Sequence, residues 1–213
     1  MKKIISLTLA AVMALSLVAC GNEKPAETTV PTVETTAPVV ETTVPVEETT
    51  GNETVSATGA LAVLENIWAQ YGEDEKFAVI GGNMESPVDG APGNYDMAYA
   101  ENLTYNLLVP AESLASVDEA ATMIHMMNAN TFTSGVVHLT EGTDVAAFAQ
   151  VMRDAIQGNM WMCGFPETLT IAVVEGEYVV IAFGINDAMN PFMTHFAEAY
   201  AEAEILFNEP IAG

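Results

Sequence analysis

The segment TLTIAVVEGEYVVIAF, residues 168–183, decides the fold of this chain. Two runs rich in β-branched residues, Thr168 to Val174 and Tyr178 to Phe183, flank the turn residues Glu175-Gly176, which predicts a β-hairpin. A helix should follow, because Asn190-Pro191 is typical of a helix start. The residues that would form its apolar face are Phe192, Phe196, Ala199, Ala203 and Leu206.

The preceding segment has the same order of elements. Ala120 to Met127 and Thr133 to Thr140 have strand composition and are joined across Asn128-Ala129-Asn130. Thr143 would then cap a helix that ends at Gly158. The apolar stripe of that helix would be Val145, Phe148, Met152 and Ile156.

This repeated order, strand-strand-helix, predicts the fold class. Four antiparallel strands with two helices packed on one face form a two-layer α+β sandwich, the simplest arrangement that buries both apolar stripes. An internal duplication is also indicated. Its matched positions are Val136-Val137, Asp144 and Phe148 in the first half and Val179-Val180, Asp187 and Phe192 in the second.

The segment before these repeats has a weaker pattern. A helix should begin at Thr58 and stop at Gly72, since apolar residues recur there at helical spacing. A short strand, Phe77 to Ile80, follows. Gly81 to Asn94 is rich in glycine and proline and predicts a loop, and Tyr95 to Leu108 predicts a helix.

The N-terminal sequence predicts that the protein is located at a membrane. Lys2-Lys3 and the apolar run Ile4 to Val18 have the layout of a secretory signal over residues 1–19, too short to span a bilayer. Leu17-Val18-Ala19-Cys20 resembles the lipobox of bacterial lipoproteins, in which the cysteine receives a diacylglycerol and becomes the first residue. This resemblance implies a cell-membrane protein, anchored through Cys20 on the extracytoplasmic face. The alternatives are a plain cleavable signal and a core helix.

A low-complexity spacer follows Cys20 and extends to residue 57. Glu-Thr-Thr recurs every seven residues, and a proline in three successive repeats excludes a helix. Such a composition cannot bury enough apolar surface to fold, so residues 20–57 predict a disordered stalk with a reach of roughly 110 Å. Neutral filler and an O-glycosylated stretch are the alternatives.

Residues 58–213 predict one globular domain with a strongly acidic surface. The whole chain has a formal net charge of −24, and the domain has 22 acidic residues against Lys76 and Arg153. This balance excludes nucleic acid as a partner and favours cationic partners or simple solubility. Cys163 is the one thiol left once Cys20 is lipidated, so no intramolecular disulfide is expected.

A family resemblance covers residues 105 to 205. Met126-Met127-Asn128 through Phe132, the strand Gly135 to Leu139, the helix at Asp144 and the run Gly176 to Val180 resemble a C-terminal domain of unknown function in clostridial-type lipoproteins. Lipobox, Thr/Pro-rich spacer and one small domain are the usual layout of that family. The resemblance implies the anchor and the fold, and it supplies no catalytic residues.

Few residues in this sequence are candidates for catalysis or metal binding. His125, His138 and His195 with Cys163 permit a small extracytoplasmic hydrolase that uses Cys163 or a carboxylate pair. Cys163 has apolar neighbours and no nearby Lys or Arg, however, which favours a buried, inert thiol. We expect no metal site and no cofactor, because no HExxH, paired CxxC or calcium loop occurs.

Methionine and aromatic residues favour a binding function instead. Trp161 and Phe165 lie in the connection between a helix and a strand, and the loop from Met84 to Tyr95 could join them. Methionines fill irregular gaps in cores, the simpler interpretation, and they also line adaptable binding surfaces. The sequence thus predicts a non-enzymatic binding domain for an envelope protein, a secreted protein or a small apolar ligand. The methionines concerned are Met123, Met126, Met127, Met160 and Met162.

Overall fold

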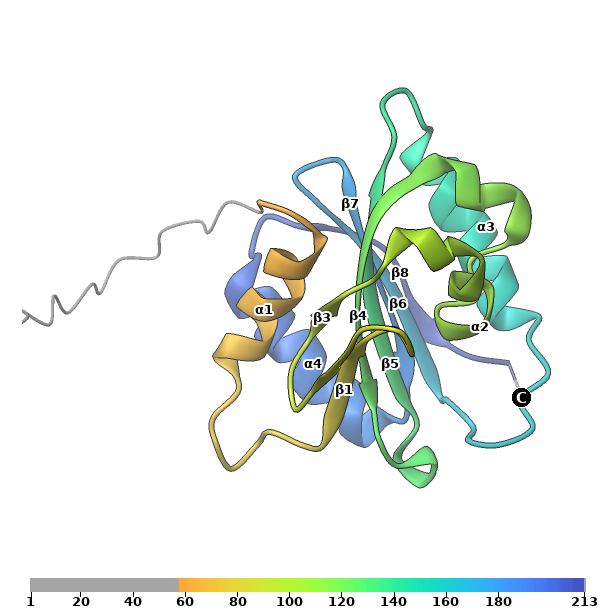
Figure 1. Cartoon of the computed structure of the whole chain (residues 1–213). Helices are drawn as coiled ribbons and strands as arrows, with labels where there is room; N and C mark the ends of the chain where they lie inside the picture. The colour runs from red at the N-terminus through yellow and green to blue at the C-terminus, as the bar shows by residue number, and fades with distance from the viewer. Residues whose placement is uncertain (1–57, 213) are drawn as a thin grey trace, which may run out of the picture. The chain divides into compact units, whose positions relative to one another are not determined.

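The structure is a computed structural model that describes residues 58–212 (Figure 1). The predicted signal peptide, the lipidated Cys20 and the spacer lie outside the described residues.

An eight-stranded antiparallel sheet forms the centre of the domain. Its order is β2-β1-β4-β5-β7-β6-β8, and β3 pairs with β4 next to β1. The predicted α+β class and antiparallel pairing are confirmed, whereas the predicted number of about four strands is wrong. The strands are β1 (Val79–Gly82), β2 (Pro87–Asp89), β3 (Gly93–Asn94), β4 (Val117–His125), β5 (Phe132–Leu139), β6 (Thr168–Val174), β7 (Tyr178–Gly184) and β8 (Glu204–Pro210).

The four central strands are those that the sequence predicts. β6 and β7 pair from Thr168 with Gly184 to Val174 with Tyr178. Glu175 and Gly176 in their turn have φ of 53° and 81°, the left-handed conformation that primed hairpin turns require. β5 pairs with β7 in the middle of the sheet and so joins the two hairpins.

Two helices, α1 (Ala60–Gln70) and α3 (Val145–Gln157), begin and end close to the predicted positions. Tyr95 to Leu108, expected as one helix, is mainly the 3-10 helix η1. The predicted cap at Thr143 is wrong, because the Asp144 carboxylate accepts the hydrogen bond from the Ala147 N–H at 3.0 Å. The helices are α1 (Ala60–Gln70), η1 (Met97–Asn102), α2 (Leu103–Asn106), η2 (Ala111–Ser116), η3 (Asn128–Asn130), α3 (Val145–Gln157) and α4 (Asn186–Ala199).

The C-terminal segment differs from the prediction. α4 starts at Asn186, before Asn190-Pro191, because the N–H groups of Ala188 and Met189 bond to the Ile185 carbonyl and close the first turn. The helix then continues through Pro191 and ends at Ala199. The residues beyond it, expected on the same helix, form the edge strand β8, which pairs with β6.

Helices cover both faces of the sheet, so the two-layer arrangement with helices on one face is wrong. α1 and α4 pack on one face, and α2 and α3 on the other (Figure 1). The reason is visible in β7, which is buried along its whole length: Val179 and Ile181 contact one helical layer, Val180 and Ala182 the other. α3 and α4, the helices that the predicted duplication matches, lie on opposite faces of the sheet, so the two halves are not arranged symmetrically.

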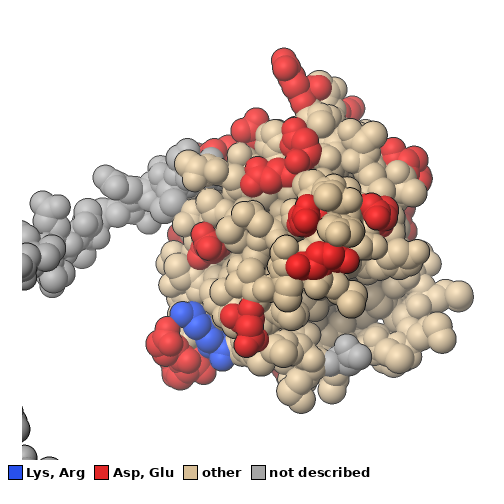
Figure 2. Space-filling view, viewed as in Figure 1, with Lys and Arg blue, Asp and Glu red and all other residues tan. Residues whose placement is uncertain are grey.

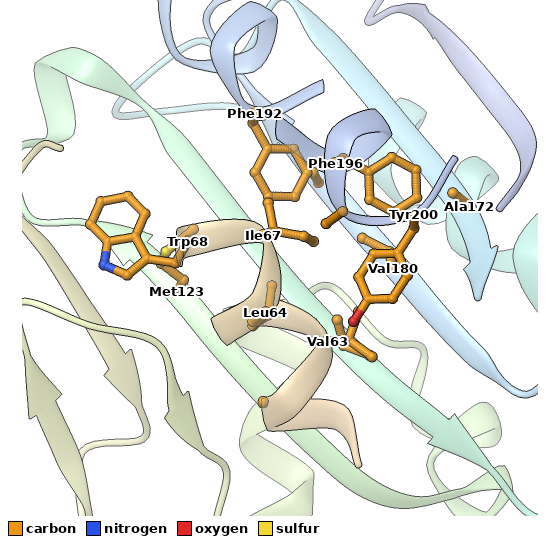
Figure 3. Close-up of a cluster of buried hydrophobic side chains, with 14 of the residues drawn as sticks. Val63, Leu64, Ile67, Trp68, Met123, Ala172, Val180, Phe192, Phe196 and Tyr200 are labelled. Carbon is orange, nitrogen blue, oxygen red and sulfur yellow. The ribbon is translucent and has the colours of Figure 1, made fainter. Parts of the chain in front are cut away.

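Figure 3 shows the core between α1, α4 and the sheet. Phe192 of α4 points toward Ile67 of α1, and Phe196 and Tyr200 belong to the same buried layer. On the opposite face, α2 and the segment around it pack on β4, β5 and β7 and leave part of this face open toward the β4–β5 turn.

Candidate functional site

An uncharged cleft of about 200 Å³ lies on the α2 side of the sheet, where the β4–β5 turn meets the loop between α3 and β6. We call it the first cleft. Tyr105 and Asn106 come from α2, Ile124 and Met127 from β4 and the turn, and Trp161 from the loop. None of the described residues that line it is Asp, Glu, Lys or Arg, although the domain has 22 acidic residues.

Trp161 supplies the aromatic wall of the first cleft. Its ring lies 5.5 Å from that of Phe183 in β7, centroid to centroid, which holds the indole against the sheet. The Trp161 Nε1 is buried and has no hydrogen-bond partner within residues 58–212. Tyr105, whose side chain is 82 % exposed, stands on the rim. A partner would therefore meet aromatic surface both at the wall and at the rim.

Four exposed methionines either line this cleft or stand next in sequence to residues that line it. Met123 is buried in the core, as the core-filling interpretation expects, but the other four methionines that the sequence analysis singled out are exposed. In Figure 2 acidic side chains lie over the upper and middle parts of the molecule and at the lower left, whereas none is seen at the lower right, over the β4–β5 turn and the α3–β6 loop. Exposed apolar groups gathered in one place indicate an interaction site. The exposed methionines are Met126, Met127, Met160 and Met162.

A second cleft of about 110 Å³ adjoins the first. Ile124 and Asn106 line both clefts, so they form the ridge between them. Gly81, Asn83 and Met84 from β1 and the β1–β2 turn form the rest of the second cleft, together with neighbouring residues.

Two asparagines give this second cleft its polar groups. The Asn83 side chain is 5 % exposed, and its Oδ1 accepts a hydrogen bond from the Ser86 N–H at 3.0 Å. The Asn83 Nδ2 is buried and has no partner among the described residues. The Asn106 Oδ1 accepts a hydrogen bond from the Tyr95 hydroxyl at 3.2 Å, which orients the amide. Both side-chain amides thus present their nitrogen as the unused group.

Carboxylates stand outside the clefts. Burial, with the charges of exposed Glu85 and Glu101, raises the pKa of Tyr95 to about 12. These two carboxylates are therefore close enough to Tyr95 to make the electrostatic potential around it more negative. The residues that line the two clefts include no Asp, Glu, Lys or Arg.

The predicted binding residues are only partly brought together. Trp161 lines the first cleft and Met84 the second. Phe165 is 69 % exposed and lines neither cleft. Tyr95 is buried and acts through Asn106, so it offers no surface of its own.

Sequence reasoning missed most of the cleft. One signal was available: residues 120–140 contain no Asp, Glu, Lys or Arg in a chain that is otherwise strongly acidic. Such a charge-free stretch could have indicated β4, the turn and β5 as the surface to examine. Tyr105, Asn106 and Ile124 are among the cleft residues that were missed, whereas Met127 belongs to the predicted binding methionines and His125 was considered only for catalysis.

Cys163 and His125 line the same cleft, but the geometry does not activate the thiol. The His125 Nδ1 accepts a hydrogen bond from the Met127 N–H at 3.0 Å, and burial lowers the pKa of His125. The neutral ring then carries its proton on Nε2 and has no lone pair left to take a proton from Cys163. No hydrogen bond joins Cys163 to another described residue, so the hydrolase alternative gains no support.

The other two histidines lie away from the clefts. His138 in β5 bonds to Asp118, which raises the pKa of the imidazole. His195 in α4 is buried and bonds through Nδ1 to Glu198 at 2.7 Å. Both have structural partners.

Between residues 58 and 212 no group of three or more His, Cys, Asp or Glu is placed to hold a metal ion. In the same part of the chain, no helix has the length and apolarity that crossing a bilayer requires.

No family model, no curated protein and no solved structure matches this chain. The resemblance of residues 105 to 205 to a clostridial lipoprotein domain therefore stays a prediction.

Cys163 gives the first test of the site. The structure places the thiol at the surface, so the expectation of a buried thiol is wrong: its neighbours belong to an exposed loop and not to the core. We expect iodoacetamide at pH 7.5 to alkylate Cys163 in the native protein at a rate within about threefold of that in the urea-unfolded protein. Mass spectrometry over time measures both rates. Strong protection in the native state would contradict this placement of the loop.

Proposed function

We propose that residues 58–212 form a non-enzymatic binding domain whose first cleft takes one apolar or aromatic side chain of a partner protein. The observation that carries this proposal is the absence of charged residues among the described lining of the cleft, on a domain with 22 acidic residues. Desolvating a carboxylate is costly, so a surface without one is the part of this domain best suited to bury apolar groups.

The size of the cleft supports one of the two predicted kinds of ligand. Sites for small molecules typically enclose about 300–1,000 Å³, whereas an apolar cavity of about 150 Å³ holds a benzene ring. At about 200 Å³ the first cleft fits a single side chain such as phenylalanine or leucine. An envelope or secreted protein is therefore favoured over a free small molecule.

The negative charge of the domain indicates which residues should flank the apolar side chain of the partner. Two basic residues against 22 acidic ones give a negative potential around an uncharged cleft. A partner with Lys or Arg beside its apolar anchor would be steered toward the site and held in register.

The binding test uses a matched pair of tyrosines in neighbouring segments. The probe is a lysine-flanked peptide with one phenylalanine, added to the whole chain while the Trp161 indole N–H signal is followed by NMR. Tyr105→Ala should weaken binding about tenfold, since Tyr105 lines the cleft. Tyr99→Ala removes an exposed tyrosine, 38 % exposed, that lines neither cleft and should leave affinity unchanged.

A comparison of two peptides separates the contribution of the apolar side chain from that of the lysines. The same peptide with alanine in place of phenylalanine should lose most of its binding, because the lysines alone do not fill the cleft. Equal binding of both peptides, or equal effects of the two tyrosine substitutions, would contradict the proposal.

The second part of the proposal is the location. We place the domain on the extracytoplasmic face of the cell membrane, held through a diacylglyceryl group on Cys20, with residues 21–57 as spacer. The support is the lipobox-like Leu17-Val18-Ala19-Cys20 after a signal-like segment, and stable anchoring by several acyl chains on one residue.

Cys20→Ala tests the anchor. The substitution removes the thiol that would receive the lipid, so the protein should move from the membrane fraction to the soluble fraction and lose labelling by palmitate. Cys163→Ala is the matched control and should stay labelled and membrane-bound. Unchanged fractionation of Cys20→Ala would contradict the anchor without affecting the cleft.

A further inference from the structure

We infer that the partner presents an extended strand, with two apolar side chains two positions apart that fill the first and second clefts, and with its main chain on Asn106. This inference rests on the proposed function and adds the conformation and the second anchor of the partner.

The arrangement of the two clefts is the first argument. Ile124 and Asn106 belong to both linings, so a single ridge separates the two clefts on one face of the sheet. In an extended strand, side chains that point to the same side recur every second residue, about 6.6 Å apart. Two adjoining clefts with a single ridge between them suit a strand, whose alternate side chains would enter the clefts while the intervening one points to solvent.

The second argument is that two side-chain amides have unused donor groups, which favours a partner in the form of a strand over one in the form of a helix. The Tyr95 hydroxyl occupies the Asn106 Oδ1, so the Asn106 Nδ2 is the group left for a ligand on the ridge. The Asn83 Nδ2, in a side chain that is 5 % exposed, has no partner among residues 58–212. A strand carries free main-chain carbonyl groups that accept from such donors, whereas a helix uses its carbonyl groups internally.

Met84 lies next to Asn83 in the lining of the second cleft. The Met84 side chain is 92 % exposed and lines the second cleft, so it is free to move aside when an apolar side chain enters. Methionine suits this role because its side chain is unbranched and polarizable.

The experiment compares three lysine-flanked peptides against the whole chain by NMR. One has phenylalanine and leucine separated by one serine, the second has serine in place of the leucine, and the third separates the two apolar residues by three serines. The observed signals are the Trp161 indole N–H, the Met84 methyl group and the Asn106 side-chain amide.

We expect the first peptide to bind about tenfold more tightly than the other two and to be the one that shifts the Met84 and Asn106 signals. All three should shift Trp161. If Trp161 responds but Met84 and Asn106 do not, the strand inference fails while the proposed function stands. If Trp161 responds to none of the peptides, both fail. Tighter binding of the third peptide would indicate a helix and overturn the inference.

Asn106→Asp tests the main-chain contact, because it removes the donor and keeps the shape and the acceptor. The added negative charge should by itself strengthen binding of a lysine-rich peptide. We expect instead that the tenfold advantage of the first peptide is lost. Asn102→Asp adds the same charge in the neighbouring helical turn and lines neither cleft, so it should retain the advantage. Equal behaviour of the two variants would overturn the role of Asn106.

Discussion

Phe192→Ala is expected to lower the free energy of unfolding by about 4 kcal/mol. Phe192 lies in α4 with no exposed side-chain surface, and its ring is 5.3 Å from that of Phe132 in β5, centroid to centroid. Figure 3 shows the ring directed at Ile67 of α1. Three elements therefore meet at this side chain, and its removal leaves a cavity that none of them can close alone.

Urea unfolding followed by circular dichroism measures the loss. About 4 kcal/mol is a large part of the 5–15 kcal/mol by which domains are stable, so the midpoint should move far to lower urea. Thr194→Ala, at an exposed position of the same helix, should change the value by less than about 0.5 kcal/mol. A loss below about 1 kcal/mol for Phe192→Ala would mean that α4 does not pack between α1 and the sheet as described.

The elements predicted from the sequence are those whose pattern is local. β6 and β7 are joined by two left-handed turn residues, and α3 has a regular apolar stripe, so each could be recognised within about twenty residues. β8 carries no such signal: it pairs with β6, its edge position leaves it mostly exposed, and its sequence follows a helix without a glycine stop. β2 and β3 have three and two residues, too few for any periodicity.

The second helical layer was missed for a different reason. Tyr178 to Phe183 is apolar at every position, and an uninterrupted apolar run is typical of a strand that is covered on both faces. The two-layer prediction placed the helices on one face, which would have exposed Val179 and Ile181. Those side chains instead contact the layer that contains α3.

The candidate site was accessible to sequence reasoning only in part. Trp161 and Met84 stood out because of their residue types in loops, and both line clefts. The clefts themselves combine α2, β1, β4 and the α3–β6 loop, and no local pattern reports that these segments meet. Cys163 shows the converse error: its apolar neighbours suggested burial, but Met162 and Phe165 are themselves exposed in the loop.

Gly81→Ala is the second substitution with a large expected effect, a loss of about 3 kcal/mol in the free energy of unfolding. A Cβ atom at Gly81 would lie 2.1 Å from the Gly93 nitrogen and 2.5 Å from the Ala91 carbonyl oxygen, both main-chain atoms. Neither strand can move away from the added methyl group without losing hydrogen bonds, because β1 and β3 are both paired with β4.

Gly72→Ala is the matched control for this substitution. Its Cβ would approach only the ends of the Asp74 and Glu75 side chains, at 3.1 Å, and these exposed groups can move away. The expected change is below about 0.5 kcal/mol, measured by the same urea unfolding. Since Gly81 also lines the second cleft, a Gly81→Ala protein that remains folded should lose the preference for the two-anchor peptide. Wild-type stability together with a retained preference would show that β3 does not lie against β1, and the second cleft would then lack one of its walls.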